Sequence, residues 1–174
     1  MTTRIRRAVL LVLPGLVLLA VGITFAVRTP RASFTPFAAP AFTLPGLRDG
    51  EASVDLAAFR GRPVVLNFFF STCKPCADEL PRFQAEAQRR GDTVVFLGID
   101  HFEPRNDGRN IVTRTKIRYP VGWDKTGTVA PTFGAIAFPT TVFIDREGVV
   151  RWRSLGALSE AALRRDIDAI SRSS

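Results

Sequence analysis

Cys73 and Cys76 are the only cysteines of the chain, and their spacing makes them its best candidates for chemistry. They follow an apolar run, 64–70, that predicts a buried strand, and they precede a predicted helix over 77–90. The amino terminus of a helix stabilises negative charge, so it favours the reactive thiolate form of a cysteine placed there. The two sulfurs are also close enough to form a disulfide. From the residues alone, a structural bridge, two inert thiols or a metal site remain alternatives.

The elements that must position the cysteines alternate between strands and helices. In chain order we expect a hairpin of 42–44 with 54–56, a buried strand at 94–100, and helices at 106–117 and 129–133. A second hairpin of 140–144 with 149–153 and a last helix from 159 onward follow. Asn106 or Asp107 is expected to cap the first of those two helices. Gly91 is expected to end the helix that follows the cysteines. This order predicts an α/β fold with a central mixed sheet flanked by helices.

The first residues form a separate region. Residues 8–27 carry no charge and follow the arginines of residues 1–7. As a helix this run reaches about 30 Å, the thickness of the hydrocarbon core of a bilayer. We therefore expect a retained signal anchor, with 1–7 in the cytoplasm, 28–39 as a tether and 40–174 as a domain outside the cytoplasm. A cleaved signal peptide is the alternative, although a good cleavage site is missing after the run.

The formal net charge of +8 raises the question of nucleic-acid binding. Five of the 24 basic residues belong to the predicted anchor and its flank, at positions 4, 6, 7, 28 and 31. The remaining 19 face 16 acidic residues and form no basic stripe broken by aromatics, so we expect no nucleic-acid partner. His101 and the two cysteines fall short of the four ligands of a structural zinc site. We expect no metal, and His101 is interpreted as a surface residue.

Three separated motifs resemble those of a known family. They are Val-Val-Leu-Asn-Phe-Phe-Phe-Ser-Thr-Cys-Lys-Pro-Cys at 64–76, Ala-Asp-Glu-Leu-Pro at 77–81 and Phe-Gly-Ala-Ile-Ala-Phe-Pro-Thr-Thr-Val-Phe-Ile-Asp at 133–145. The chain resembles the thioredoxin fold from about residue 40 to 170, and within it the TlpA/ResA-like, DsbE/CcmG-related family of membrane-anchored thiol–disulfide oxidoreductases. The resemblance implies a thioredoxin-like domain with an amino-terminal β-hairpin extension, preceded by one transmembrane helix.

The resemblance implies a role for each matched residue. Cys73 would be the nucleophile and Cys76 the resolving thiol, and the pair would alternate between a dithiol and a Cys73–Cys76 disulfide. Glu79 would relay protons and tune the thiol pKa, because burial raises the pKa of a carboxyl group. A first-turn acid that only favours the helix dipole is the alternative. Pro139 matches the family's cis-proline in the substrate groove; without the motif it would be an ordinary strand-edge proline.

Neighbours of these residues are expected to contact the substrate: Thr72, Lys74, Phe138 and Thr140. Lys74 would add positive charge that favours the thiolate, or would simply be solvated. Thr72 stands where the family usually has Trp, and Phe138 is bulky for its position, so both bear on which partner is bound. Asn67 replaces the buried aspartate of thioredoxins proper, so a proton relay would fall to Glu79.

The resemblance implies a cofactor-free enzyme that reduces disulfides of exported proteins, such as apocytochrome c, with electrons from a membrane thiol donor. It would be a monomer anchored by a single span in the inner or cell membrane. A dithiol oxidase remains an alternative. A difference of a few kcal/mol in the stabilisation of the Cys73 thiolate separates a reductant from an oxidant. A thiol peroxidase would need a Pro-x-x-x-Thr-x-x-Cys motif, which is absent. A redox-inert binding module on the same fold also stays open, although the presence of both cysteines argues against it.

Overall fold

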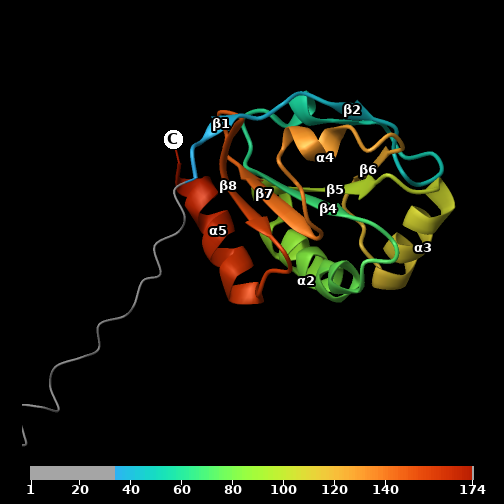
Figure 1. Ribbon diagram of the computed structural model, residues 1–174. Coiled ribbons are helices and arrows are strands. Elements are labelled where there is room, and N and C mark those ends of the chain that lie inside the picture. The colour runs from blue at the N-terminus through green and yellow to red at the C-terminus, as the bar shows by residue number, and fades with distance from the viewer. Residues whose placement is uncertain (1–33, 174) are drawn as a thin grey trace, which may run out of the picture. The chain divides into compact units, whose positions relative to one another are not determined.

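The structure is a computed structural model that describes residues 34–173 (Figure 1). The predicted anchor at 8–27, the segment 1–7 and the first part of the tether lie outside the described residues. Between residues 34 and 173, no helix combines the length and the apolar character needed to cross a bilayer.

The described residues form one six-stranded sheet, one two-stranded hairpin and the helices around them. The sheet has the order β1-β8-β7-β4-β5-β6, and β2 pairs with β3 in the hairpin predicted from the sequence. In chain order the elements are β1 Phe37–Ala38, β2 Thr43–Leu44, β3 Val54–Asp55, η1 Leu56–Phe59, β4 Val64–Phe69, α2 Lys74–Arg90, η2 Gly91–Thr93, β5 Val95–His101, α3 Arg105–Thr115, β6 Val121–Asp124, α4 Val129–Thr132, β7 Thr140–Ile144, β8 Val149–Leu155 and α5 Glu160–Arg172.

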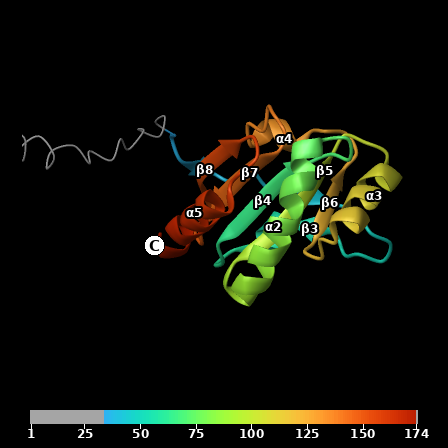
Figure 2. The same ribbon diagram turned by 90° about the horizontal axis from the view of Figure 1, so that it is seen from below.

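Strand directions bring several functional segments to one edge of the sheet. β4, β5 and β6 run parallel to one another, whereas β7 runs antiparallel to both β4 and β8. The carboxyl ends of β4, β5, β6 and β8 therefore meet the amino end of β7 at one edge, called here the cysteine edge. Figure 2 shows α4 and the beginning of α2 at this end of the sheet.

Helices cover the sheet on two sides (Figure 1). One face packs against α2, α3 and α5, and the other packs against α4 and the β2–β3 hairpin. Successive side chains of a strand point to opposite faces. Along β4, Val65 and Phe69 accordingly join the first core, while Leu66 and Phe68 join the second. Asn67 thus falls on the face that α2 covers, where a helical residue can reach its amide.

The structure corrects several predicted boundaries. α2 begins at Lys74 instead of residue 77, because Cys73 caps it and a proline is tolerated in the first turn of a helix. α3 begins after Pro104, without a side-chain cap from Asn106 or Asp107. It ends at Thr115, because Lys116 adopts the left-handed conformation that stops a helix (φ 58°).

Two strands were missed in the sequence. β6 contains a glycine and follows Pro120, so it lacks the alternating apolar pattern by which strands are recognised. β1 lies within the segment predicted to be a tether, 28–39. Phe37 and Ala38 instead pair with Val150 and Val149 at the edge of the sheet, so the sheet begins before the predicted domain boundary at residue 40.

Candidate active site

A disulfide joins Cys73 and Cys76 at the beginning of α2. Cys73 is the residue that caps the helix: the backbone N–H of Cys76 donates to Cys73 Sγ at 3.2 Å. Cys76 is fully buried, and Cys73 exposes 6% of its surface. A donated N–H and the positive end of the helix dipole both stabilise negative charge on Cys73 Sγ once the disulfide is reduced. The position therefore favours a reactive thiolate at Cys73.

Glu79 is the buried carboxyl group nearest to the pair in sequence. It lies one turn after Cys76 on α2, and the residue is fully buried. Its Oε1 accepts a hydrogen bond from Asn67 Nδ2 at 2.9 Å, and its Oε2 accepts one from the Leu158 N–H at 3.1 Å. Burial raises the pKa of Glu79 to about 7, although the Leu158 N–H, the Asn67 amide and the charge of Arg82 act to lower it. Glu79 can therefore gain or lose a proton near neutral pH.

Asn67 connects Glu79 to the sheet. Its Nδ2 also donates to Thr141 Oγ1 on the neighbouring strand β7, at 3.2 Å. Its Oδ1 is buried and has no hydrogen-bond partner among the described residues. Because an amide does not titrate, Asn67 can hold the Glu79 carboxyl group in both protonation states without competing for its proton.

Pro139 lies in the loop before β7, and the Phe138–Pro139 peptide bond is cis, as the resemblance implied. The Pro139 carbonyl accepts a hydrogen bond from the Gly156 N–H at 2.8 Å. The Phe138 ring lies edge-on to the Phe70 ring, with centroids 5.3 Å apart. The Phe70 carbonyl in turn accepts from the Cys73 N–H at 3.2 Å. Side-chain packing and one backbone bond therefore connect the proline loop to the first cysteine.

The residues predicted to bind substrate divide into two groups. Thr72 and Lys74 are exposed beside the disulfide, and Lys74 Nζ lies 2.7 Å from Asp78 Oδ2, also on the surface. Phe138 is half-buried. Thr140 requires a correction, because it is fully buried and its hydroxyl donates to the Ala137 carbonyl at 2.5 Å. Its side chain supports the proline loop and does not face a substrate.

Glu103 is a site residue that the sequence did not reveal. Its carboxylate accepts from the Ser71 N–H at 2.7 Å and from the Ser71 hydroxyl. Its carbonyl accepts from Trp123 Nε1 at 3.0 Å. Glu103 thereby fixes the loop that leads into Cys73. The signal that could have found it is its position shortly after a strand that neighbours β4, since the ends of parallel strands share one edge.

Of the residues shortly before Glu103, His101 differs from expectation, whereas Asp100 lies in the strand predicted to be buried. His101 is not a surface residue: only 20% of its side chain is exposed, and its ring stacks on Phe138 with centroids 4.8 Å apart. Asp100 is fully buried. Burial and the nearby carboxylates of Glu103, Asp107 and Asp124 raise the pKa of Asp100 to about 9, so it is neutral at pH 7. Within residues 34–173, no group of three or more acidic, histidine or cysteine side chains is arranged to hold a metal.

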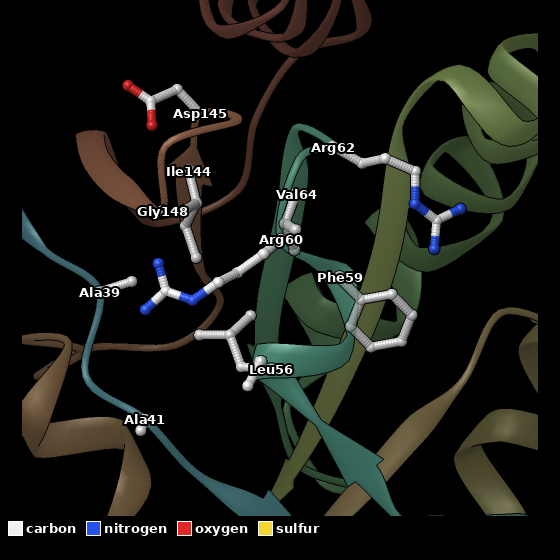
Figure 3. A pocket seen from close by; sticks show the side chains of 11 residues that line it. Ala39, Ala41, Leu56, Phe59, Arg60, Arg62, Val64, Ile144, Asp145 and Gly148 are labelled. Carbon is white, nitrogen blue, oxygen red and sulfur yellow. The ribbon is translucent and has the colours of Figure 1, made fainter.

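A pocket at the opposite edge of the sheet is separate from this site (Figure 3). It has a volume of about 400 Å³, counting space open to solvent, and its walls include Val64 at the start of β4 and Ile144 at the end of β7. Figure 3 shows the Arg60 side chain extending across it toward Ala39. Because Cys73 follows the other end of β4, the pocket cannot serve the disulfide.

Comparison with known proteins places the chain in a family. A model of the AhpC/TSA family matches residues 37–153. The chain belongs to the AhpC/TSA family. Among curated relatives, thiol-disulfide oxidoreductase ResA of Bacillus thuringiensis subsp. konkukian (strain 97-27) is 32% identical over 115 residues. That match covers 64% of this chain and 64% of the relative, so the chain spans somewhat less than two thirds of the length of ResA.

Solved structures agree on the fold. A protein from Chlorobium tepidum assigned as thiol:disulfide interchange protein DsbE superposes with a TM-score of 0.74 at 24% identity, covering 80% of this chain and 99% of that one. The dsbF protein of Mycobacterium tuberculosis, described in mixed oxidized and reduced forms, gives 0.68 at 25% identity, with 74% and 94% covered. This AhpC/TSA-family chain therefore has the thioredoxin-like fold predicted from its motifs.

Proposed function

We propose that this AhpC/TSA-family protein is a thiol–disulfide oxidoreductase that reduces disulfides of exported proteins. The observation that carries the proposal is the Cys73–Cys76 disulfide at the beginning of α2, with the buried, titratable Glu79 one turn away. The similarity to ResA supports the same chemistry. The peroxidase alternative has no support in the motifs of the sequence, because neither cysteine is the last residue of a Pro-x-x-x-Thr-x-x-Cys motif.

The reaction begins with the reduced protein. The Cys73 thiolate attacks one sulfur of the substrate disulfide, a bond forms between Cys73 and that sulfur, and the other substrate sulfur leaves as a thiolate that takes up a proton. The Glu79 carboxylate then accepts the proton of Cys76. The Cys76 thiolate attacks Cys73 Sγ, closes the Cys73–Cys76 disulfide and releases the second substrate thiolate. Two electrons have passed from the protein to the substrate.

The protonation state of Glu79 sets the pH dependence of the second step. A carboxyl group with a pKa of about 7 is a base above that pH and an acid below it. The closing step should therefore slow as the pH falls below about 7. Asn67 and the Leu158 N–H hold the carboxylate in one orientation throughout, because both donate to it.

The proposed setting is outside the cytoplasm, at the membrane. The uncharged run at 8–27 after several arginines supports an anchor with the domain exported. A disulfide such as Cys73–Cys76 also persists in an oxidising compartment. Disulfides of exported proteins such as apocytochrome c are the proposed substrate class, and a membrane thiol donor would return the protein to its dithiol form.

The test is the reduction potential of the full-length protein, measured by equilibration with thiol–disulfide buffers. A reductant should lie near the value of thioredoxin, about −270 mV. A value near that of DsbA, about −120 mV, would contradict the proposed direction and favour the dithiol oxidase. The Cys73→Ser variant is the control that should not exchange at all. The Cys76→Ser variant should accumulate a mixed disulfide with its partner, which identifies the substrate.

A further inference from the structure

Four exposed arginines gather at the edge of the sheet opposite the cysteine edge. We call this set the arginine end; its members are Arg60, Arg62, Arg118 and Arg146. The first two lie in the turn before β4, the third precedes β6, and the fourth lies in the turn from β7 to β8. Because β4 and β6 run in the same direction and β7 runs antiparallel to β4, these three segments meet at one edge of the sheet.

Contacts between these segments join the arginines into one surface. The Gly61 N–H donates to the Arg146 carbonyl at 3.0 Å. Arg60 and Arg62 both border the pocket of Figure 3, where their side chains leave the turn in different directions. Arg62 also borders a second, more open hollow of about 830 Å³, counting space open to solvent, and Arg118 lines that hollow as well. The arginine end is therefore continuous and contains two adjacent hollows.

The arginine end carries positive charge that the fold does not neutralise. None of its four guanidinium groups forms an ion pair with a carboxylate of residues 34–173. Asp145, the acidic residue in the wall of the first pocket, is buried and pairs with Arg151 instead. Asp92 and Glu147 are exposed nearby in the second hollow and in the β7–β8 turn. Four arginines against these two acids leave a positive surface that suits an anionic partner.

The first of the two hollows has mainly apolar walls, which include Leu56, Phe59, Val64 and Ile144. The Arg62 guanidinium lies over the Phe59 ring, 5.6 Å from its centroid. Arginine binds phosphate oxygens through its paired N–H donors. Arginines around apolar walls therefore match a phosphate group that is attached to hydrocarbon, as it is in a phospholipid.

The position of this surface along the chain also favours a lipid partner. Ala39 and Ala41, which line the apolar pocket, come soon after the first described residue, Phe34. Residues 28–33 alone separate Phe34 from the predicted anchor at 8–27. Six residues reach at most about 20 Å when fully extended. An anchored domain is therefore confined to the neighbourhood of the bilayer, where its arginines can reach lipid headgroups.

We propose that the arginine end binds anionic phospholipid headgroups of the membrane that anchors the chain. The inference rests on the membrane setting proposed above and adds a lipid-binding surface to it. β4 has six residues, and a strand rises about 3.3 Å per residue, so the disulfide lies roughly 20 Å from this surface. Binding of lipid at the arginine end leaves the cysteine edge directed away from the bilayer, where exported proteins can reach it.

The experiment measures how fast phenylglyoxal modifies each arginine of the full-length protein. The protein is placed, one molecule per disc, in lipid discs of phosphatidylcholine alone or of phosphatidylcholine mixed with phosphatidylglycerol. Phenylglyoxal reacts with accessible guanidinium groups, and mass spectrometry of the digested protein gives a rate constant for each site. Arg82 and Arg114, which are exposed on α2 and α3, serve as controls within the same molecule.

Phosphatidylglycerol should slow the modification of the arginine end about tenfold, because a guanidinium group held at a phosphate is not accessible. Tenfold corresponds to about 1.4 kcal/mol, a difference that several arginines beside an anionic surface supply. The rate constants of Arg82 and Arg114 should be nearly the same in the two kinds of disc. High salt should remove the protection, since it screens the attraction between exposed charges.

A set of variants tests whether the protection belongs to this surface. Arg146 should lose its protection when the other three members of the arginine end are replaced together, as Arg60→Gln, Arg62→Gln and Arg118→Gln. The matched variant loses three positive charges elsewhere on the domain, through Arg82→Gln, Arg114→Gln and Lys125→Gln. Arg146 should stay protected in that variant. Equal loss in both variants would mean that only the net charge matters, and would overturn the inference.

Other outcomes separate the inference from the proposed function. Equal rates in the two kinds of disc, or protection by phosphatidylcholine alone, would overturn the lipid-binding surface. Protection that requires two protein molecules per disc would assign the surface to a second copy. If the full-length protein does not enter the discs, the membrane setting is wrong and the inference falls with it. Protection of the arginine end together with a reduction potential near that of DsbA would refute the proposed reductase and support the lipid-binding surface.

Discussion

Glu79→Gln tests whether the buried carboxyl group titrates as its surroundings indicate. Glutamine has the same shape and no charge. Its Oε1 can accept from the Leu158 N–H, as Glu79 Oε2 now does at 3.1 Å. Its Nε2 can donate to Asn67 if the Asn67 amide turns over, and Asn67 Oδ1 has no hydrogen-bond partner at present. The variant side chain should therefore keep one hydrogen bond at each of its two polar atoms.

The expected magnitude follows from the pKa difference. Burial raises the pKa of Glu79 from 4.5 to about 7 in the folded protein. The unfolded chain therefore releases this proton first, and the folded state loses stability as the pH rises from about 4.5 to about 7. Each pH unit in that interval is worth about 1.36 kcal/mol. Ionisation of Glu79 should thus cost the wild type about 3 kcal/mol at pH 8, a cost that Glu79→Gln does not carry.

The assay is urea unfolding of oxidised residues 34–174, for the wild type and the variant, from pH 4 to pH 9. The two proteins should have similar free energies of unfolding at pH 4. The variant should become more stable by about 3 kcal/mol at pH 8, with most of the change between pH 5 and pH 7. A difference that stays constant over this range would refute the reasoning, because Glu79 would then have an ordinary pKa.

Further variants test single contacts. Asp100→Asn should raise the free energy of unfolding at pH 7 by an amount on the order of a few kcal/mol, because the folded protein holds this acid neutral while the unfolded chain ionises it. The gain should vanish near pH 3.5 in urea titrations extended to that pH. Phe102→Gly should leave Tm unchanged or raise it. Relief of about 1–2 kcal/mol of strain in the left-handed backbone exceeds the roughly 0.5–1 kcal/mol of extra conformational entropy that glycine loses on folding. A clear fall in Tm would show that the ring stabilises the fold. Glu86→Gln should cost about 1–2 kcal/mol at pH 7, because hydrogen bonds from Arg90 and Arg164 outweigh burial and lower the pKa of Glu86. That loss should shrink as the pH falls below 4, and a loss independent of pH would contradict the ion-pair explanation.

The parts of the site that could be predicted from the sequence are those encoded by short stretches of chain. Cys73 and Cys76 lie within a few residues of the strand and helix that hold them, so local patterns were sufficient to place them. The cis bond at Pro139 follows from a motif around that residue. In each case the residues that determine the geometry are close in sequence to the residue that is positioned.

Contacts between distant segments could not be predicted in this way. Glu103 accepts a hydrogen bond from Ser71, which is 32 residues earlier, and no local sequence pattern indicates this pair. Thr140 was predicted to contact substrate, yet β7 is an inner strand that is covered on both faces, so the Thr140 side chain is buried. β6 was missed for a related reason: its pairing with β5 is set by tertiary packing around Gly122, and not by an alternating pattern.

Glu79 and Asp100 show why only one of two buried acids can carry protons in this site. Both are fully buried, so loss of water raises the pKa of each. Glu79 receives hydrogen bonds from Asn67 and the Leu158 N–H, which stabilise its charged form and bring its pKa to about 7. Asp100 has no donor among the described residues and faces other carboxylates, so its pKa rises to about 9. At neutral pH Glu79 exchanges protons readily, whereas Asp100 stays protonated. Because both acids are equally buried, the donors around Glu79 and the carboxylates around Asp100 separate a proton acceptor from a structural acid.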